Sequence, residues 1–323
     1  MTGTLAPTLQ AFFTDRLMRQ RGASPHTIAA YRDAMRLLLT FAQQRLAKPP
    51  SALDLADLEA VLIGAFLDHL QHERGSSVRT RNARLAAIHS LFKFAALRHP
   101  EQAALIQRVL AIPPKKFDKA LITYLTATEI EALLATPDRL TRPGRRDHAL
   151  LLLTVRTGLR VSELINLNRA DLHLGVGAHV TCLGKGRKRR STPLDRQTVA
   201  VLNVWLNERG GEPPDPLFPA RTGARLSRDA VERLVTKHAI AAGLKAVTPH
   251  VLRHSAAMQL LHAGVDIAVI ALWLGHEQTE TTQIYLHADM TIKQRALDRT
   301  TPPKTKPGRY QPTDSVLAFL DSL

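Results

Sequence analysis

Apolar residues recur at helical spacing along most of the chain and predict a mainly α-helical protein. In the N-terminal part, this pattern is found in residues 24–46, 55–75 and 76–99. Ser24 is suited to cap the first of these helices, Pro25 fits its first helical position, and Gly75 is suited to end the second. The three segments predict a helical N-terminal domain over residues 1–111.

A second domain is expected over residues 126–299. It follows residues 112–125, which contain a proline pair and a basic cluster without periodicity and are therefore predicted to be a linker. Thr126 and Glu129 have the spacing of a capping box and predict the start of a helix. Further helices are expected at residues 147–158, 195–209, 227–242, 248–264, 266–275 and 279–288.

Two segments interrupt the helical pattern. Residues 178–194 predict two short strands joined by a tight Gly-Lys-Gly turn, so the expected fold is mainly α with a small β-sheet or hairpin. Residues 300–323 form a tail whose first part is rich in Pro and Lys and predicted to be extended and flexible. The tail ends in a short amphipathic segment that needs a surface to dock on. Its apolar residues are Val316, Leu317, Phe319, Leu320 and Leu323.

The charge of the chain points to nucleic acid. Lys and Arg (44) exceed Asp and Glu (28) by 16, and the pI is about 10.6. A merely basic surface is the alternative. The single cysteine, Cys182, excludes an intramolecular disulfide, and we find neither a signal peptide nor a membrane-length apolar run. A cytoplasmic protein is therefore expected.

Two basic clusters are candidates for contacts with DNA phosphates. Arg79, Arg81 and Arg84 lie in the first turns of the helix predicted over residues 76–99, where free backbone N–H groups also favour phosphate. The second cluster follows the hairpin turn and comprises Arg187, Lys188, Arg189 and Arg190. Solvated surface positions are the alternative for both.

The motif TPHVLRHS combines residues that suit a phosphodiester. His250 and Arg253 are three residues apart and share one helix face. A guanidinium fits two phosphate oxygens, and an imidazole donates a hydrogen bond or transfers a proton near neutral pH. The i, i+4 pair His250 and His254 allows a zinc interpretation, but no catalytic Glu lies between them and one cysteine supplies no structural site. No metal is therefore expected.

Three further motifs carry candidate chemistry. In TGLRVSEL, Arg160 lies in an interhelical turn where it either binds an anion or pairs with Glu163. In LGKGRKRR, Lys185 lies between two glycines and is placed to protonate a leaving oxygen. In LGHEQTETTQIYLH, Tyr285 follows His276. A tyrosine on a helix usually serves packing, yet this hydroxyl is a candidate nucleophile if cationic residues offset the charge of a phosphate.

The order of these motifs resembles one family. TGLRVSEL, LGKGRKRR, HVLRH, LGH and a tyrosine nine residues later resemble the tyrosine recombinase (phage integrase) family, most closely its Xer-like and transposon-borne members. SPHTIAAY and TRNARLAAIHSLFKF resemble its N-terminal core-binding domain. The resemblance implies a C-shaped, two-domain DNA clamp with a SAM-like helical domain and an α+β catalytic domain.

The resemblance also implies roles for the candidate residues. Arg160 and Arg253 would be the activating arginines, Lys185 the general acid, His250 and His276 the two histidines, and Tyr285 the nucleophile. Tyr285 would form a 3′-phosphotyrosyl link and free a 5′-hydroxyl, which then attacks the corresponding link in a partner strand. Because the bond energy is kept in the covalent intermediate, no cofactor is expected.

The same resemblance implies which partners the protein binds, while two other functional interpretations stay open. The expected partner is double-stranded DNA with an inverted-repeat site, bound by a tetramer in which residues 316–323 dock on a neighbouring subunit. Docking within the same subunit is the alternative. A DNA-binding architectural protein without chemistry and a type IB topoisomerase-like enzyme are the other functional interpretations. Residues 300–312 are longer and richer in Pro than expected of a minimal Xer protein.

Overall fold

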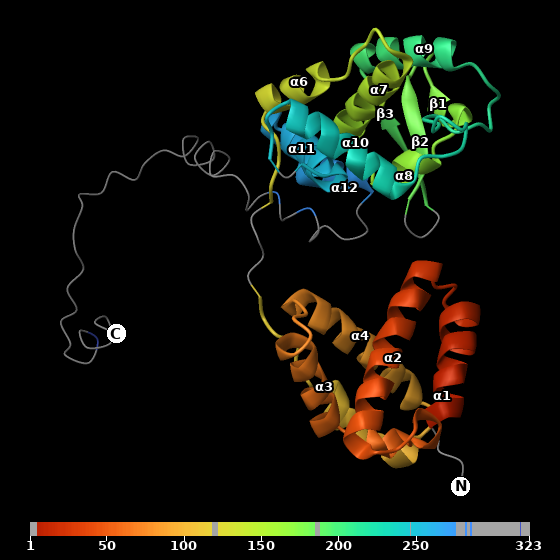
Figure 1. Cartoon of the computed structure of the whole chain (residues 1–323), viewed down its shortest axis with the longest axis vertical. Coiled ribbons are helices and arrows are strands. Elements are labelled where there is room, and N and C mark those ends of the chain that lie inside the picture. The colour runs from red at the N-terminus through yellow and green to blue at the C-terminus, as the bar shows by residue number, and fades with distance from the viewer. Residues whose placement is uncertain are drawn as a thin grey trace. The chain divides into compact units, whose positions relative to one another are not determined.

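The computed structural model describes residues 5–117, 122–184, 188–245 and 247–275, together with Thr282, Tyr285 and Leu317. The chain divides into two compact units, Met1–Lys119 and Ala120–Leu323 (Figure 1). The division falls inside the segment predicted to be a linker, residues 112–125. The mainly helical fold with one small sheet that the sequence predicts is confirmed.

The first unit is a helical bundle. Its elements are α1 (Leu5–Ala11), the π-helix η1 (Phe12–Gln20), α2 (Pro25–Leu46), the 3-10 turns η2 (Pro50–Ala52) and η3 (Leu55–Asp57), α3 (Ala60–His72), α4 (Val78–Ala95), the 3-10 turn η4 (Pro100–Gln102) and α5 (Ala103–Leu110). Helices α2, α3 and α4 pack against one another. Phe12 is fully buried in their core, 6.2 Å from the Tyr31 ring and 5.8 Å from the Phe94 ring.

One predicted helix of this unit is wrong at its start. The helix expected over residues 55–75 begins only at Ala60, because Asp54 and Asp57 close a separate 3-10 turn through a reciprocal capping box. The predicted cap at Ser24 is confirmed, since its side chain accepts a hydrogen bond from the backbone N–H of Thr27.

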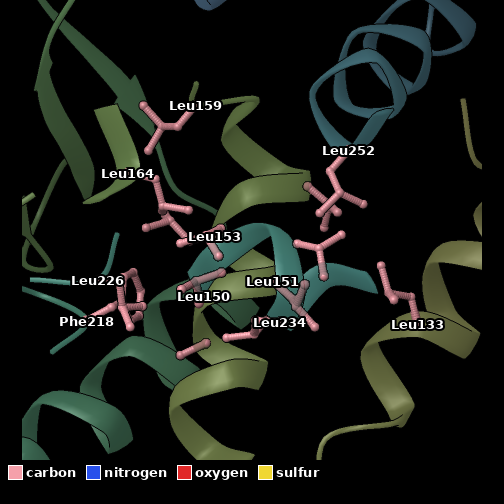
Figure 2. Packing of buried hydrophobic residues seen from close by; sticks show 14 of the residues in the cluster. Leu133, Leu150, Leu151, Leu153, Leu159, Leu164, Phe218, Leu226, Leu234 and Leu252 are labelled. Atoms are coloured by element: carbon pink, nitrogen blue, oxygen red, sulfur yellow. The ribbon is translucent and has the colours of Figure 1, made fainter. Parts of the chain in front are cut away.

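The second unit is built around one buried helix. Its helical elements are α6 (Ala127–Ala135), α7 (Arg142–Thr157), α8 (Val161–Asn166), the 3-10 turn η5 (Arg169–Asp171), α9 (Arg196–Arg209), α10 (Arg228–Ala241), α11 (Pro249–His262) and α12 (Ile267–Leu274). Helix α7 packs against both α9 and α11 and is buried on all sides along most of its length. Figure 2 shows Leu150, Leu151 and Leu153 of α7 among Leu234 and Leu252.

The sheet of this unit is small and antiparallel. It has the order β1 (Leu172–His173), β2 (His179–Leu183) and β3 (Arg189–Pro193). Leu183 pairs with Arg189 and Cys182 pairs with Arg190, so β2 and β3 form the predicted hairpin. The sequence did not predict β1. Lys185 and Arg187, in the connection between β2 and β3, lie outside the described residues.

Candidate active site

Arg160 owes its position to the turn that follows α7. Gly158 ends α7 in the left-handed region with φ 64°, and a Cβ on it would lie 2.6 Å from the Leu274 side chain. A glycine is therefore required for both reasons. Two residues later Arg160 is the N-cap of α8, and its side chain is one-third exposed.

Arg253 lies one turn into α11 and is almost entirely buried. Thr248 caps this helix and Pro249 occupies its first turn, as the sequence predicts. The guanidinium of Arg253 donates from Nη1 to the Gly158 carbonyl (2.6 Å) and from Nη2 to the Leu274 carbonyl (2.8 Å). Burial and the charge of Arg160 lower the pKa of Arg253 to about 10, so it stays cationic at neutral pH.

Glu163 is the carboxylate that joins two arginines. Its Oε1 accepts from Arg160 Nη1 (2.9 Å) and Arg190 Nη1 (2.8 Å). Its Oε2 accepts from Arg190 Nη2 (2.8 Å) and from the backbone N–H of Arg160 (2.8 Å). Burial opposes ionisation of Glu163, but these hydrogen bonds outweigh it and lower its pKa to about 2. The alternative of an Arg160–Glu163 ion pair is confirmed, and it coexists with the arginine cluster.

The end of α12 binds all three arginines. The carbonyl of Trp273 accepts from Arg190 Nε (3.2 Å), that of Leu274 from Arg253 Nη2 (2.8 Å) and that of Gly275 from Arg160 Nη2 (3.2 Å). The last carbonyls of a helix have no partners within it and carry partial negative charge. Three consecutive carbonyls therefore bring three guanidinium groups together.

Tyr285 lies close to this cluster and is buried. Its hydroxyl is 3.0 Å from His254 Nδ1, and the residue is 1% exposed. Burial raises the pKa of Tyr285, while the charges of Arg253 and Arg160 oppose that rise. Tyr285 belongs to the same buried cluster as Leu274, whose carbonyl binds Arg253. The hydroxyl is held in its protonated form in this environment.

The imidazole of His254 lies beside the hydroxyl of Tyr285, and the imidazole of His250 lies next to that of His254. The rings of His250 and His254 are 4.2 Å apart, and His250 is exposed. Burial, followed by His250 and Arg253, lowers the pKa of His254 to about 4, so this imidazole is neutral at pH 7. The sequence singled out His254 only as a possible zinc ligand; its position directly after Arg253 was the signal for a role beside Tyr285.

The predicted catalytic residues are thus partly placed. The structure brings Arg160 and Arg253 together with Tyr285 nearby, and His250 reaches this group through His254. Lys185 and His276 lie outside the described residues. In the described part of the chain, no group of three or more His, Cys, Asp or Glu side chains is arranged to hold a metal ion.

The predicted phosphate-binding residues separate into exposed and inward-facing groups. Lys188 and Arg189 are exposed. Arg79 is exposed above the Phe117 ring, and Arg84 is half-buried beside Ser76.

Arg81 and Arg190 differ from the expected surface position. Arg81 is 5% exposed and donates to Asn82 Oδ1 (3.1 Å). Neighbouring residues of a strand point to opposite faces of the sheet. Arg189 points to solvent, so Arg190 points inward and contacts Glu163. Both side chains are bound within the protein.

No helix in the described ranges has the length and apolar character needed to cross a bilayer.

Comparison with known proteins places this geometry in a family. The family model "Phage integrase family" matches residues 123–291, and "Phage integrase, N-terminal SAM-like domain" matches residues 11–99. The chain is 54% identical to a Sinorhizobium fredii protein that carries the provisional name integrase/recombinase y4rC, over 99% of this chain and 98% of that protein. It is 34% identical to the tyrosine recombinase XerC of Xanthomonas campestris, over 90% of this chain and 87% of that protein.

Solved structures show the same fold. The XerH site-specific recombinase bound to its difH substrate has a TM-score of 0.67 at 23% identity, covering 86% of this chain and 81% of that one. The Tn1549 transposon integrase in complex with circular intermediate DNA has a TM-score of 0.68 at 17% identity, covering 93% of this chain and 100% of that one.

These findings define the class of protein: a two-domain tyrosine recombinase that acts on DNA. The chain belongs to the phage integrase family and is a tyrosine-type site-specific recombinase. Nothing among the matches favours an architectural protein or a topoisomerase-like enzyme.

Proposed function

We propose that this chain cuts and rejoins DNA strands through a covalent link to Tyr285, at a phosphate bound by Arg160 and Arg253. The observation that carries the proposal is the binding of both guanidinium groups by the end of α12, together with the burial of Tyr285 in the cluster that contains Leu274 of that helix. Each guanidinium has five N–H donors, and the hydrogen bonds to α8, α12 and Gly158 use only part of them. Donors therefore remain for phosphate oxygens.

The chemistry needs no external energy source. The Tyr285 oxygen attacks phosphorus, the bond to the 5′-oxygen breaks, and the phenolic proton passes to the neighbouring imidazole or to water. In this proposal Lys185 protonates the leaving 5′-oxygen, and His250 and His276 donate hydrogen bonds to the phosphate. A 5′-hydroxyl of the partner strand then attacks the 3′-phosphotyrosyl link and releases Tyr285.

Preorganisation supports the role of the arginines. Because their positions are fixed by hydrogen bonds within the protein before DNA arrives, little reorganisation is needed when negative charge develops on the phosphate. Removing one such donor typically slows a reaction by about 10²–10³.

The proposal is tested with a nicked DNA duplex that traps the covalent intermediate. The Tyr285→Phe variant should bind DNA with unchanged affinity and form no protein–DNA adduct on a denaturing gel. Tyr31→Phe, a change in the first unit, is the matched control and should form the adduct as the unaltered protein does. An adduct formed by Tyr285→Phe would refute the assignment of the nucleophile.

Basic residues with exposed or half-buried side chains supply the proposed DNA contacts. We assign phosphate contacts to Arg79 and Arg84 on α4, and to Lys188 and Arg189 at the hairpin, with Arg187 as a further expected contact. Such contacts position the protein without reading sequence. Arg81 and Arg190 are not included, because both are bound within the protein.

We also propose how copies of the chain assemble. The substrate is double-stranded DNA with inverted-repeat sites, held in a clamp by each subunit of a tetramer, and residues 316–323 dock on a neighbouring subunit. The solved relatives bound to difH DNA and to a transposon circular intermediate support a site-specific or mobile-element substrate. Since the substrate is the DNA of a bacterial host, we expect the protein in the cytoplasm, on the nucleoid when bound.

The tail supplies the test of assembly. A chain that ends after residue 309 should bind a single site normally and form fewer synaptic complexes in a gel-shift assay. Recombination by the shortened chain at the rate of the complete one would refute the proposed exchange.

A further inference from the structure

Arg190 has a different role from its neighbours on β3. Its Nε, Nη1 and Nη2 all donate to protein oxygens, one to the Trp273 carbonyl and two to Glu163. Its side chain is 12% exposed. Resting on the proposed function above, we infer that Arg190 is a positioning residue for strand cleavage: by binding both oxygens of Glu163, it keeps that carboxylate from neutralising Arg160.

The shared carboxylate sets the charge of the site. Arg190 takes both oxygens of Glu163 in a bidentate pair, whereas the side chain of Arg160 contacts only Oε1. One negative charge is thus divided between two cations. Without Arg190, Glu163 is available to pair fully with Arg160, its neighbour on the same helix turn. Arg160 would then present less positive charge to a phosphate.

The position of Arg190 is fixed by a close contact with the chain. A Cβ on Gly275 would lie 2.9 Å from Arg190 Nη1 and 3.2 Å from its Cζ. The guanidinium therefore packs against the peptide whose carbonyl binds Arg160. The planar guanidinium of Arg190 donates to the Glu163 carboxylate and to the Trp273 carbonyl at the same time. The ammonium group of a lysine does not reproduce this geometry.

Arg190 also connects the hairpin to the arginine cluster. It pairs with Cys182 across the β2–β3 ladder, and the connection between these strands carries Lys185 in the sequence. A loss of activity in an Arg190 variant therefore has two possible routes, through Arg160 or through the proposed general acid. We infer the route through Arg160, and the leaving group of the DNA substrate distinguishes the two routes.

The experiment measures single-turnover cleavage at saturating protein for Arg190→Met, Glu163→Gln and the double variant. We expect Arg190→Met to cleave about 10- to 100-fold more slowly. The double variant should cleave faster than Arg190→Met, because it lacks the carboxylate charge that captures Arg160. A double variant that cleaves as slowly as Arg190→Met, or more slowly, would overturn the inference.

A substrate with sulfur in place of the 5′-bridging oxygen tests the route. A thiolate leaves without being protonated, so this substrate does not need a general acid. Arg190→Met should cleave this substrate slowly as well. If its cleavage rate returns to that of the unaltered protein, the inference is overturned and the defect is assigned to the general acid. Arg190→Lys keeps the charge without the fork, should also cleave slowly, and serves if Arg190→Met does not fold.

A matched control separates stability from positioning. Arg145 and Glu208 form another bidentate pair in the same unit, 2.6 and 2.7 Å long, between α7 and α9. Arg145→Met should cleave like the unaltered protein. Removing one positioned donor slows a reaction by more than about threefold. If Arg190→Met cleaves within about threefold of the rate of Arg145→Met, the inference is overturned. Failure of the proposed function is seen separately, as an unaltered protein that forms no adduct.

Discussion

Lowering the pH should destabilise the second unit through His254. This imidazole has a pKa of about 4 in the folded protein against an ordinary 6.5, because of burial and the nearby charges of His250 and Arg253. Between these two values the unfolded chain binds more protons than the folded one. Stability is therefore fully present above pH 6.5 and is lost as the pH falls from 6.5 toward 4.

The size of this loss follows from the two pKa values. Their difference corresponds to at most about 3 kcal/mol. Because the ring is only partly buried, water screens its interactions, and we expect roughly 1–2 kcal/mol. This is a sizeable fraction of the stability of a domain.

Urea unfolding of the complete chain at a series of pH values between 7.5 and 4.5 measures the loss. Tryptophan fluorescence reports on the second unit alone, since Trp205 and Trp273 are the two tryptophans of the chain. His254→Phe keeps an aromatic ring but cannot be protonated, so its stability should depend less on pH in this window. His173→Phe, at an exposed position on β1, is the matched control. If His254→Phe and the unaltered protein lose the same stability, the reasoning is wrong.

Three other predictions concern the same unit. Glu163, with a pKa of about 2 against an ordinary 4.5, contributes stability that is present above pH 4.5 and lost as the pH falls toward 2; Glu163→Gln should lack this second loss in a urea series extended from pH 4.5 to 2. Gly275→Ala and Gly264→Ala both place a side chain at positive φ (65° and 82°), which costs about 1–2 kcal/mol. Only in Gly275→Ala does the new side chain also contact Arg190, so this variant should be less stable than Gly264→Ala and should cleave DNA more slowly. Equal stability and equal cleavage rates of the two variants would contradict the close packing. Lys188→Ala and Arg189→Ala should each reduce the slope of log affinity against log salt by about 1, and an unchanged slope would exclude the phosphate contact.

Local signals predicted much of the fold. The capping residues Thr126, Ser227 and Thr248 each begin the helix that the sequence expects, because capping depends only on residues within one turn. The π-helix over Phe12–Gln20 was not predicted, since its hydrogen bonding does not follow the 3.6-residue period. The start of α7 at Arg142 was also missed, although Thr141 and Pro143 are suitable start signals.

The candidate site was predicted less completely. Arg160, Arg253 and Tyr285 were recognisable from their motifs, but the role of Glu163 was not, because it was considered only as an alternative to anion binding by Arg160. The burial of Arg190 depends on contacts with Glu163 and Trp273, which lie 27 and 83 positions away in the sequence. A run of four basic residues does not reveal which of them faces inward, since that depends on the register of the hairpin.

The central claim is that the oxygen of Tyr285 becomes bonded to DNA, and identifying the attachment site tests it most directly. The adduct formed on a nicked duplex is digested with protease and nuclease, and the modified peptide is sequenced by mass spectrometry. The account predicts a nucleotide joined through its 3′-phosphate to Tyr285. A nucleotide on any other residue, or one joined through its 5′-phosphate, would contradict it.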